Sequence, residues 1–171
     1  MAEEKPAFKI SILASGSSGN SLYIESDKKR LLVDAGLSGK KITSLMAQID
    51  RTPDQLDGIL VTHEHRDHIH GVGVLARKYH LDVFANEKTW EAMSPLIGNV
   101  PIEQKHLFEM GKVQTFGDLD VESFGVSHDA AAPQFYRFYK ENRSFVMLTD
   151  TGYCNDRMRG IITVSYTHLT L

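Results

Sequence analysis

Ten residues in the first half of the chain, THEHRDHIHG (62–71), concentrate side chains that bind metal ions. His63, His65 and His68 follow the hydrophobic run GILV, and Asp67 directly precedes the last of them. Positions two apart at a strand end point to the same side, so His63 and His65 could bind one ion. Asp67 and His68 would project toward a neighbouring position. Imidazole and carboxylate ligands suit zinc, manganese or iron, and the lack of partner cysteines argues against a structural zinc finger.

Three further polar residues follow apolar strand-like runs directly. Asp34 ends LLVD, His128 ends ESFGVSH and Asp150 ends FVMLTD. Taken singly, His128 is more often a surface or capping residue, and the two aspartates are often turn residues. Together with the histidine cluster they predict four strand ends that meet at one edge of a sheet. The alternative for the cluster itself is a solvated, histidine-rich loop.

The elements that must position these residues are strands and helices in alternation. Alternating and β-branched segments predict strands, and apolar residues at helical spacing predict helices, the first with Ser38 as N-cap. We expect Pro95 to interrupt the last helix. The expected strands are 8–15, 21–26, 30–34, 56–62, 82–86, 112–116, 119–127, 134–140 and 144–150, and the expected helices are 38–49, 71–80 and 88–97. This order indicates an α/β layered domain.

Composition sets limits on the class of protein. The 171 residues, 42% hydrophobic and 24% charged, suit one globular domain. No apolar run reaches the length of a membrane span, and the polar N-terminus has no signal core, so we expect a cytoplasmic protein without a membrane partner. The single cysteine, Cys154, agrees with a reducing compartment. The net charge of −3 gives no global basic footprint, which counts mildly against nucleic acid but leaves room for a local patch.

The motif T-H-x-H-x-D-H-x-x-G, with the strand-end Asp34, His128 and Asp150, resembles the metallo-β-lactamase-fold hydrolases. The opening ASGSSGNS (14–21), followed in order by LLVDAG, VTHEHRDHIHG and LTDTGY, is more narrowly similar to the YycJ/WalJ branch, over roughly residues 8–162. The resemblance implies an αββα sandwich. It also implies a metal-dependent hydrolase that cleaves phosphodiester bonds, a DNA 5′→3′ exonuclease linked to mismatch repair.

The resemblance further implies two divalent metal ions, zinc or manganese, and a role for each residue of the motif. A hydroxide bridging the ions would attack phosphorus in line, and Asp67 would orient it or accept its proton. Asp34 would orient a ligand histidine. The implied ligands are His63, His65 and His128 for the first ion, Asp67 and His68 for the second, and Asp150 between the two.

Two other segments carry candidate substrate contacts. Ser15, Ser17, Ser18 and Asn20 lie in a glycine-rich loop that could offer backbone N–H groups and hydroxyls to a phosphate. The alternative is a tight turn whose glycines supply positive φ. The segment QFYRFYK (134–140) could stack a base and hold a phosphate, although alternating aromatic residues are more often core residues.

The family normally continues into a second βα half with one more ligand histidine, and this sequence stops before it. We therefore expect a single domain over 1–171 that holds only the N-terminal part of the sandwich. His168 comes too soon after Asp150 to replace the missing ligand. We interpret 163–171, TVSYTHLTL, as a non-native tail; the alternative is a naturally short protein.

Three functions remain in competition. The first is the exonuclease, with DNA as partner. The second is a small-molecule hydrolase of thioesters, lactones or cyclic phosphates, because one fold hosts many chemistries. The third is a binding module or an inactive fragment. Nothing in the sequence indicates a protein partner, and metal stoichiometry separates the third hypothesis from the first two.

Overall fold

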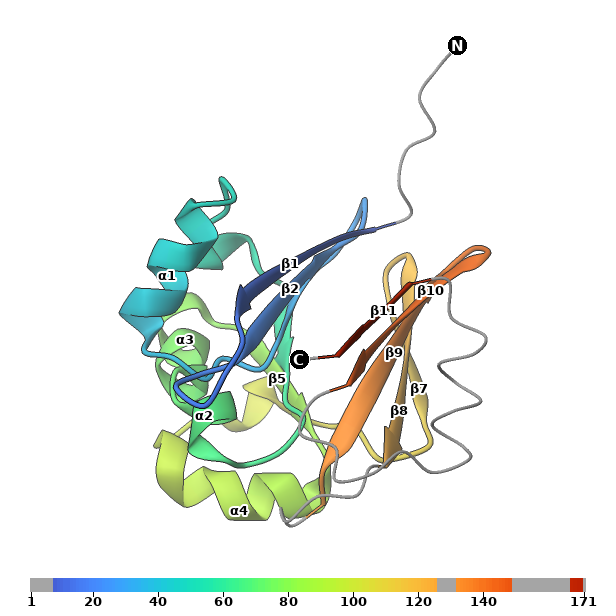
Figure 1. Cartoon of the computed structure of the whole chain (residues 1–171). Coiled ribbons are helices and arrows are strands. Elements are labelled where there is room, and N and C mark those ends of the chain that lie inside the picture. The colour runs from blue at the N-terminus through green and yellow to red at the C-terminus, as the bar shows by residue number, and fades with distance from the viewer. Residues whose placement is uncertain (1–7, 126–131, 149–166, 171) are drawn as a thin grey trace.

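Two β-sheets face each other, and helices pack on the outer side of one of them (Figure 1). The computed structural model describes residues 8–125, 132–148 and 167–170. In these residues, no helix is long and apolar enough to cross a membrane. The mixed α/β architecture confirms the expected fold class.

The first sheet has six strands that follow one another in sequence order. The first three strands are antiparallel, and the last four, from β3 onward, run parallel. Parallel strands bring their carboxyl ends to the same edge, which is where polar loops can meet. The strands are β1 Lys9–Ala14, β2 Ser21–Glu25, β3 Arg30–Val33, β4 Gly58–Leu60, β5 Asp82–Ala85 and β6 Lys105–Leu107.

The second sheet has five strands in the order β11-β10-β9-β8-β7. Strands β7 to β10 form an antiparallel meander, and β11 pairs parallel with β10. Strand β11 lies within 163–171, and the interpretation of this segment as a non-native tail stays a prediction. The strands are β7 Val113–Phe116, β8 Leu119–Gly125, β9 Gln134–Lys140, β10 Arg143–Leu148 and β11 Thr167–Thr170.

The helices follow strand ends of the first sheet. Ser38 caps the first one, as expected, because its side chain accepts a hydrogen bond from the backbone N–H of Lys41. The last one runs through Pro95, so the expected interruption is wrong. Proline has no N–H to bond the carbonyl oxygen of Glu91, four residues earlier. Both residues are exposed, so water can satisfy this carbonyl and the helix can continue. The helices are α1 Gly39–Ala47, α2 Arg66–Ile69, α3 Val72–Tyr79 and α4 Glu87–Ile97, with short 3₁₀ turns at Pro53–Gln55 and Ile102–Gln104.

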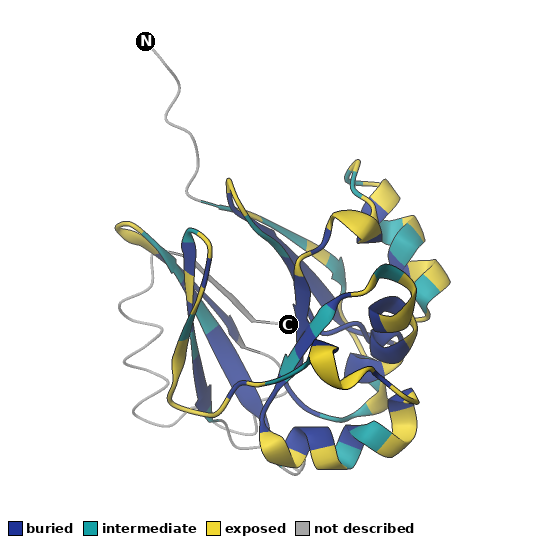
Figure 2. Ribbon diagram, turned by 180° about the vertical axis from the view of Figure 1, so that it is seen from behind, coloured by how far each residue is buried: buried dark blue, intermediate teal, exposed yellow. Residues whose placement is uncertain are grey.

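The core has two layers because alternate residues of the first sheet face opposite sides. Leu32, Ile59 and Val61 face the helices, while Leu31 and Leu60 face the second sheet. The central strands of the two sheets are accordingly buried, and the outer surfaces of the helices are exposed (Figure 2). The described residues thus supply three of the four layers of an αββα sandwich.

The aromatic segment of β9 belongs mainly to the core. Phe135, Tyr136 and Phe138 are at most 1% exposed, so they cannot stack on a base. The side chain of Arg137 lies over the Tyr139 ring, and Lys140 forms ion pairs with aspartates. The alternative that the aromatic residues of this segment are core residues is therefore confirmed for Phe135, Tyr136 and Phe138, whereas Tyr139 is half-buried.

A cluster of polar and charged side chains surrounds the buried Glu25 at the end of β2. The Glu25 carboxylate accepts hydrogen bonds from the Tyr23 hydroxyl (2.6 Å), Arg30 Nε (2.9 Å) and Arg51 Nε (2.7 Å). The bond from Arg51 lowers the pKa of Glu25 to about 2, although burial opposes the shift. Burial and the neighbouring Glu25 raise the pKa of Tyr23 to about 12. The cluster joins β2, β3 and the segment after α1.

We predict that this cluster makes stability depend on pH in acid. The depressed pKa of Glu25 contributes stability above its ordinary value of 4.5, and this contribution is lost as the pH falls toward about 2. Glu25→Gln should lower the free energy of unfolding at neutral pH and flatten its decline between these limits. Denaturant titrations over the range measure both effects. The exposed Glu91→Gln is the matched control, and equal pH profiles for the two variants would contradict the prediction.

Candidate metal centre

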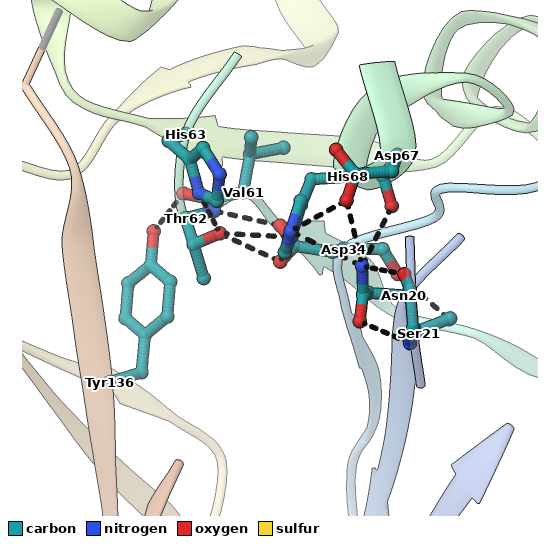
Figure 3. A network of polar contacts seen from close by, with 10 residues as sticks. Asn20, Ser21, Asp34, Val61, Thr62, His63, Asp67, His68 and Tyr136 are labelled. Carbon is teal, nitrogen blue, oxygen red and sulfur yellow. Dashed lines mark hydrogen bonds and ion pairs between the residues drawn. The ribbon is translucent and has the colours of Figure 1, made fainter. Parts of the chain in front are cut away.

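Asp34 lies at the centre of a polar network beneath the histidine cluster (Figure 3). It follows β3 with a φ of 62°, a conformation that is uncommon outside glycine but that aspartate adopts more readily than most residues. Its side chain is fully buried. The carboxylate accepts hydrogen bonds from the Thr62 backbone N–H (2.8 Å) and hydroxyl (2.7 Å), and from His68 Nδ1 (2.7 Å). The buried charge is thus compensated by three donors.

The Thr62 hydroxyl connects the Asp34 carboxylate to the ring of His63 and thereby determines which ring nitrogen of His63 carries the proton. Its single proton goes to Asp34, because a carboxylate can only accept. The Thr62 oxygen must therefore accept from His63 Nδ1, which lies 2.8 Å away. This arrangement places the ring proton of His63 on Nδ1 and makes Nε2 its basic nitrogen. Thr62 links two neighbouring strand ends, since Asp34 follows β3 and His63 follows β4.

His68 is held in the same tautomer by direct contact. Its Nδ1 donates to Asp34, so Nε2 is again the basic nitrogen. The rings of His63 and His68 have centroids 4.0 Å apart, and both residues are at most 1% exposed. A carboxylate that holds one ring nitrogen while the other faces a metal is the common arrangement around ligand histidines.

His65, the N-cap residue of the short helix α2, and Asp67 within that helix complete the described part of the cluster. The His65 ring lies edge-on to that of His63, with centroids 4.8 Å apart. Asp67 is in the first turn of the helix, and its Oδ2 lies 3.6 Å from His68 Nε2. Its side chain is 29% exposed, so the carboxylate can reach both the buried imidazoles and solvent.

Close backbone contacts join three loops at this edge. A Cβ at Gly36 would lie 1.6 Å from the carbonyl oxygen of Asp67, and one at Gly71 would lie 2.3 Å from that of Leu37. The backbone N–H of Ala35 donates to the His68 carbonyl at 2.9 Å. Glycine is therefore required at positions 36 and 71, because any side chain would push the loop after β3 away from α2.

Strand β9 of the second sheet holds the backbone between β4 and His63 in place. The Tyr136 hydroxyl donates to the Val61 carbonyl (2.6 Å), and the Gln134 backbone N–H donates to the Thr62 carbonyl (2.9 Å). Asn86 Nδ2 in turn donates to Gln134 Oε1 (3.0 Å). Sequence reasoning missed these residues. The available signal was the two-residue spacing of Gln134 and Tyr136, which places two polar groups on one face of a strand rich in aromatic residues.

The glycine-rich loop lies beside the cluster, and its residues divide into two groups. Ser15, Ser17 and Ser18 are exposed, whereas Asn20 is buried and contacts Asp67 and His68. Gly16 has a φ of 145°, as the tight-turn alternative expects. The loop thus has an exposed tip and a buried base.

The structure brings six of the predicted site residues together and does not describe the other two ligands. One cluster holds Asp34, His63, His65, Asp67, His68 and Asn20. His128 and Asp150 lie outside the described residues. Within the described ranges, no three His, Cys, Asp or Glu side chains by themselves form a group that could hold an ion. The donor chemistry nevertheless fits a metal, because two buried imidazoles have their basic nitrogen at Nε2.

The expected convergence needs one correction. Strands β3 and β4, which precede Asp34 and His63, belong to the first sheet, whereas β8 and β10 belong to the second. The four strands that precede the predicted ligands are therefore divided between two sheets, rather than aligned at one edge of a single sheet. His70, which directly follows α2, is exposed.

The fold and this buried histidine–aspartate network define a metallo-hydrolase class, and sequence comparison agrees. The sequence model of the metallo-β-lactamase superfamily matches residues 14–169, and the chain belongs to that superfamily. This confirms the resemblance expected from the motif.

Two bacterial relatives show the similarity to the YycJ/WalJ branch. The chain is 72% identical over 157 residues to exodeoxyribonuclease WalJ of Streptococcus pneumoniae serotype 2, covering 91% of this chain and 58% of the relative. It is 62% identical over 153 residues to exodeoxyribonuclease YycJ of Bacillus anthracis, covering 90% and 58%. The chain thus spans less than two thirds of the length of these curated relatives.

A solved structure shows the same fold at low sequence identity. A diphosphatase from the PhnP family superposes with a TM-score of 0.71 and 19% identity, covering 90% of this chain and 69% of the other.

We predict that the Thr62 hydroxyl is needed for metal affinity. Thr62→Val keeps the side-chain shape but removes the link between Asp34 and His63, whereas Thr62→Ser keeps the hydroxyl. The valine variant should bind zinc roughly 10–100-fold more weakly, as is typical when a partner of a ligand histidine is lost. It should also lose about 1–3 kcal/mol of stability, because a buried polar group is left unpaired. Calorimetric zinc titration and denaturant unfolding measure the two effects. Equal zinc affinity in the valine and serine variants would contradict the prediction.

Proposed function

We propose that this chain carries the metal-binding part of a metal-dependent phosphodiesterase that degrades DNA from the 5′ end. The observation that carries the proposal is the buried Asp34 carboxylate, which fixes the Nδ1–H tautomer of His63 through Thr62 and that of His68 directly. Two imidazoles set with Nε2 as the basic nitrogen are arranged for cation binding. The names of the two bacterial relatives support the choice of DNA as substrate.

The metal ions proposed are two divalent cations, zinc or manganese. His63 and His65, with His128, would hold one of them, and Asp67 and His68 the other, with Asp150 shared between the two. Bound cations of this kind lower the pKa of water and neutralise charge that develops on a phosphate. The superfamily supports divalent metal ions in general, and the number and identity belong to the proposal.

The residues of the chain itself have distinct tasks in this proposal. Asp34 and Thr62 hold the imidazole rings and keep the basic nitrogens at Nε2. Asp67 has a partly exposed carboxylate at the end of a network that is otherwise buried. We assign to it the orientation of the attacking water and the acceptance of its proton, because a carboxylate beside the reacting group can act as a general base.

A local basic surface supports nucleic acid as partner despite the net charge of −3. Helices α1 and α3, which begin directly after the loops of the site, carry basic residues and no acidic ones. Between them lies a groove of about 440 Å³, lined in part by Lys40, Thr43, Lys78 and Tyr79. Both lysines are exposed. Exposed lysines can neutralise the phosphates of a bound strand.

The nearest rival is a small-molecule hydrolase of thioesters, lactones or cyclic phosphates. The shared fold with a diphosphatase shows that one scaffold serves different substrates, and fold alone does not choose among them. A third possibility is a chain that binds one ion or none and has no catalysis of its own. The number of metal ions bound per chain and the substrate that is hydrolysed distinguish the three candidate functions.

The test measures metal content and DNA cleavage in one preparation. We expect about two zinc or manganese ions per chain and release of the terminal nucleotide first from 5′-labelled DNA. His68→Ala should abolish cleavage, because it removes a predicted ligand and a partner of Asp34. His70→Ala is the matched control, since this histidine is exposed in the same turn and should leave cleavage unchanged.

Each contrary result points to one rival. Intact DNA together with hydrolysis of a thioester, lactone or cyclic phosphate would establish the small-molecule hydrolase. One ion or fewer per chain, without hydrolysis of any of these substrates, would establish the non-catalytic alternative.

A further inference from the structure

Asn20 has more hydrogen-bond acceptors around its side-chain nitrogen than it has hydrogens to donate. The residue is 5% exposed and lies at the base of the glycine-rich loop. Its Nδ2 lies 2.9 Å from the Gly16 carbonyl oxygen, 3.3 Å from the Asp67 carbonyl oxygen, 3.2 Å from Asp67 Oδ2 and 3.3 Å from His68 Nε2. An amide nitrogen carries two hydrogens, so these four acceptors compete for them.

The orientation of the amide is set by its other end. The Gly16 backbone N–H donates to Asn20 Oδ1 at 3.1 Å, so the oxygen faces the loop backbone. The basic nitrogen of His68 is Nε2, because its Nδ1 donates to Asp34. Asn20 can therefore act as donor to His68 Nε2, and this contact is a hydrogen bond rather than a clash of two donors.

The four acceptors fall into two pairs with different chemistry. His68 Nε2 and Asp67 Oδ2 are the atoms assigned above to the second cation. The other two are the backbone carbonyl oxygens of Gly16 and Asp67. Cation binding would occupy the first pair and leave one carbonyl for each amide hydrogen.

We propose that Asn20 is a positioning residue that couples the conformation of the glycine-rich loop to cation binding at Asp67 and His68. Without a cation, its two hydrogens are divided among the loop, the turn and the two ligand atoms. With a cation, both hydrogens hold the loop backbone at Gly16 to the turn at Asp67. The inference rests on the proposed metal site and extends it to the loop.

This coupling gives the exposed loop tip a defined role. Ser15, Ser17 and Ser18 project from a loop whose base is closed by Asn20 and Gly16. A loop that is ordered by the cation would present its hydroxyl and N–H groups to a phosphate only when the cation is in place. Asn20 therefore acts from beneath the loop, and its burial separates it from the three serines that could contact a substrate.

The test compares zinc affinity and loop protection in the 171-residue chain and three variants. Zinc chloride is titrated by calorimetry, and hydrogen exchange of peptides spanning residues 15–20 is followed with and without zinc. In the unmodified chain, zinc should slow exchange in this segment. Asn20→Ala should weaken binding of the second ion roughly 10-fold or more and remove the zinc-dependent slowing. Ser18→Ala, exposed in the same loop, is the control and should retain both properties.

Asn20→Asp separates coupling from affinity. Aspartate has the same shape but cannot donate, and its charge beside Asp67 should keep or raise zinc affinity. The coupling should nevertheless be lost, so zinc should no longer slow exchange in the loop. This variant also serves if the alanine variant does not fold, as judged by circular dichroism.

The outcomes distinguish this inference from the proposed function. Zinc binding by the unmodified chain, with equal zinc-dependent protection in the Asn20→Asp variant, would overturn the coupling alone. A lack of zinc binding by the unmodified chain would overturn the metal site and the coupling with it. Loss of protection in the Asn20 variants, with protection retained in Ser18→Ala, would establish the coupling.

Discussion

The buried carboxylate of Asp34 is the constraint on which the rest of the site depends. It lies in a left-handed backbone conformation, has no exposed surface and accepts three hydrogen bonds. A buried charge is tolerated only where donors surround it, so Thr62 and His68 must keep their positions. Through these two residues the carboxylate sets the protonation pattern of both buried imidazoles.

The surrounding fold keeps this network in place from two sides. The close approach at Gly36 and Gly71 lets the loop after β3 lie against α2, so that Asp34 reaches His68. On the side of the second sheet, Tyr136 and Gln134 donate hydrogen bonds to the carbonyl groups of Val61 and Thr62. The aromatic strand that resembled a nucleic-acid contact in sequence thus serves the site indirectly, by fixing the backbone that carries His63.

The sequence predicted the longer helices and all described strands except β6 and β11, because their apolar periodicity is strong. It also identified the histidine cluster and Asp34, because polar residues directly after apolar strands are conspicuous. Other features left no periodic signal. Helix α2 has four residues, fewer than the pattern of an amphipathic helix needs. The continuation of α4 through Pro95 depends on solvent exposure of one turn, which no local pattern reports.

The contacts between distant residues were beyond sequence reasoning for a different reason. The link from Asp34 through Thr62 to His63, and the four competing acceptors around Asn20, depend on distances between loops that are far apart in the chain. A candidate residue can be recognised by type and place, but its hydrogen-bond partner follows only from the packed structure. The division between two sheets of the strands that precede the predicted ligands has the same origin.

The central claim is that Asp34 fixes His63 and His68 in the tautomer with the proton on Nδ1. Long-range ¹H–¹⁵N correlation spectra of the histidine rings in the metal-free chain report this directly, because protonated and unprotonated ring nitrogens differ in their ¹⁵N shifts. The structure predicts a protonated Nδ1 and an unprotonated Nε2 in both rings. A proton on Nε2 and none on Nδ1 in either ring would contradict the account.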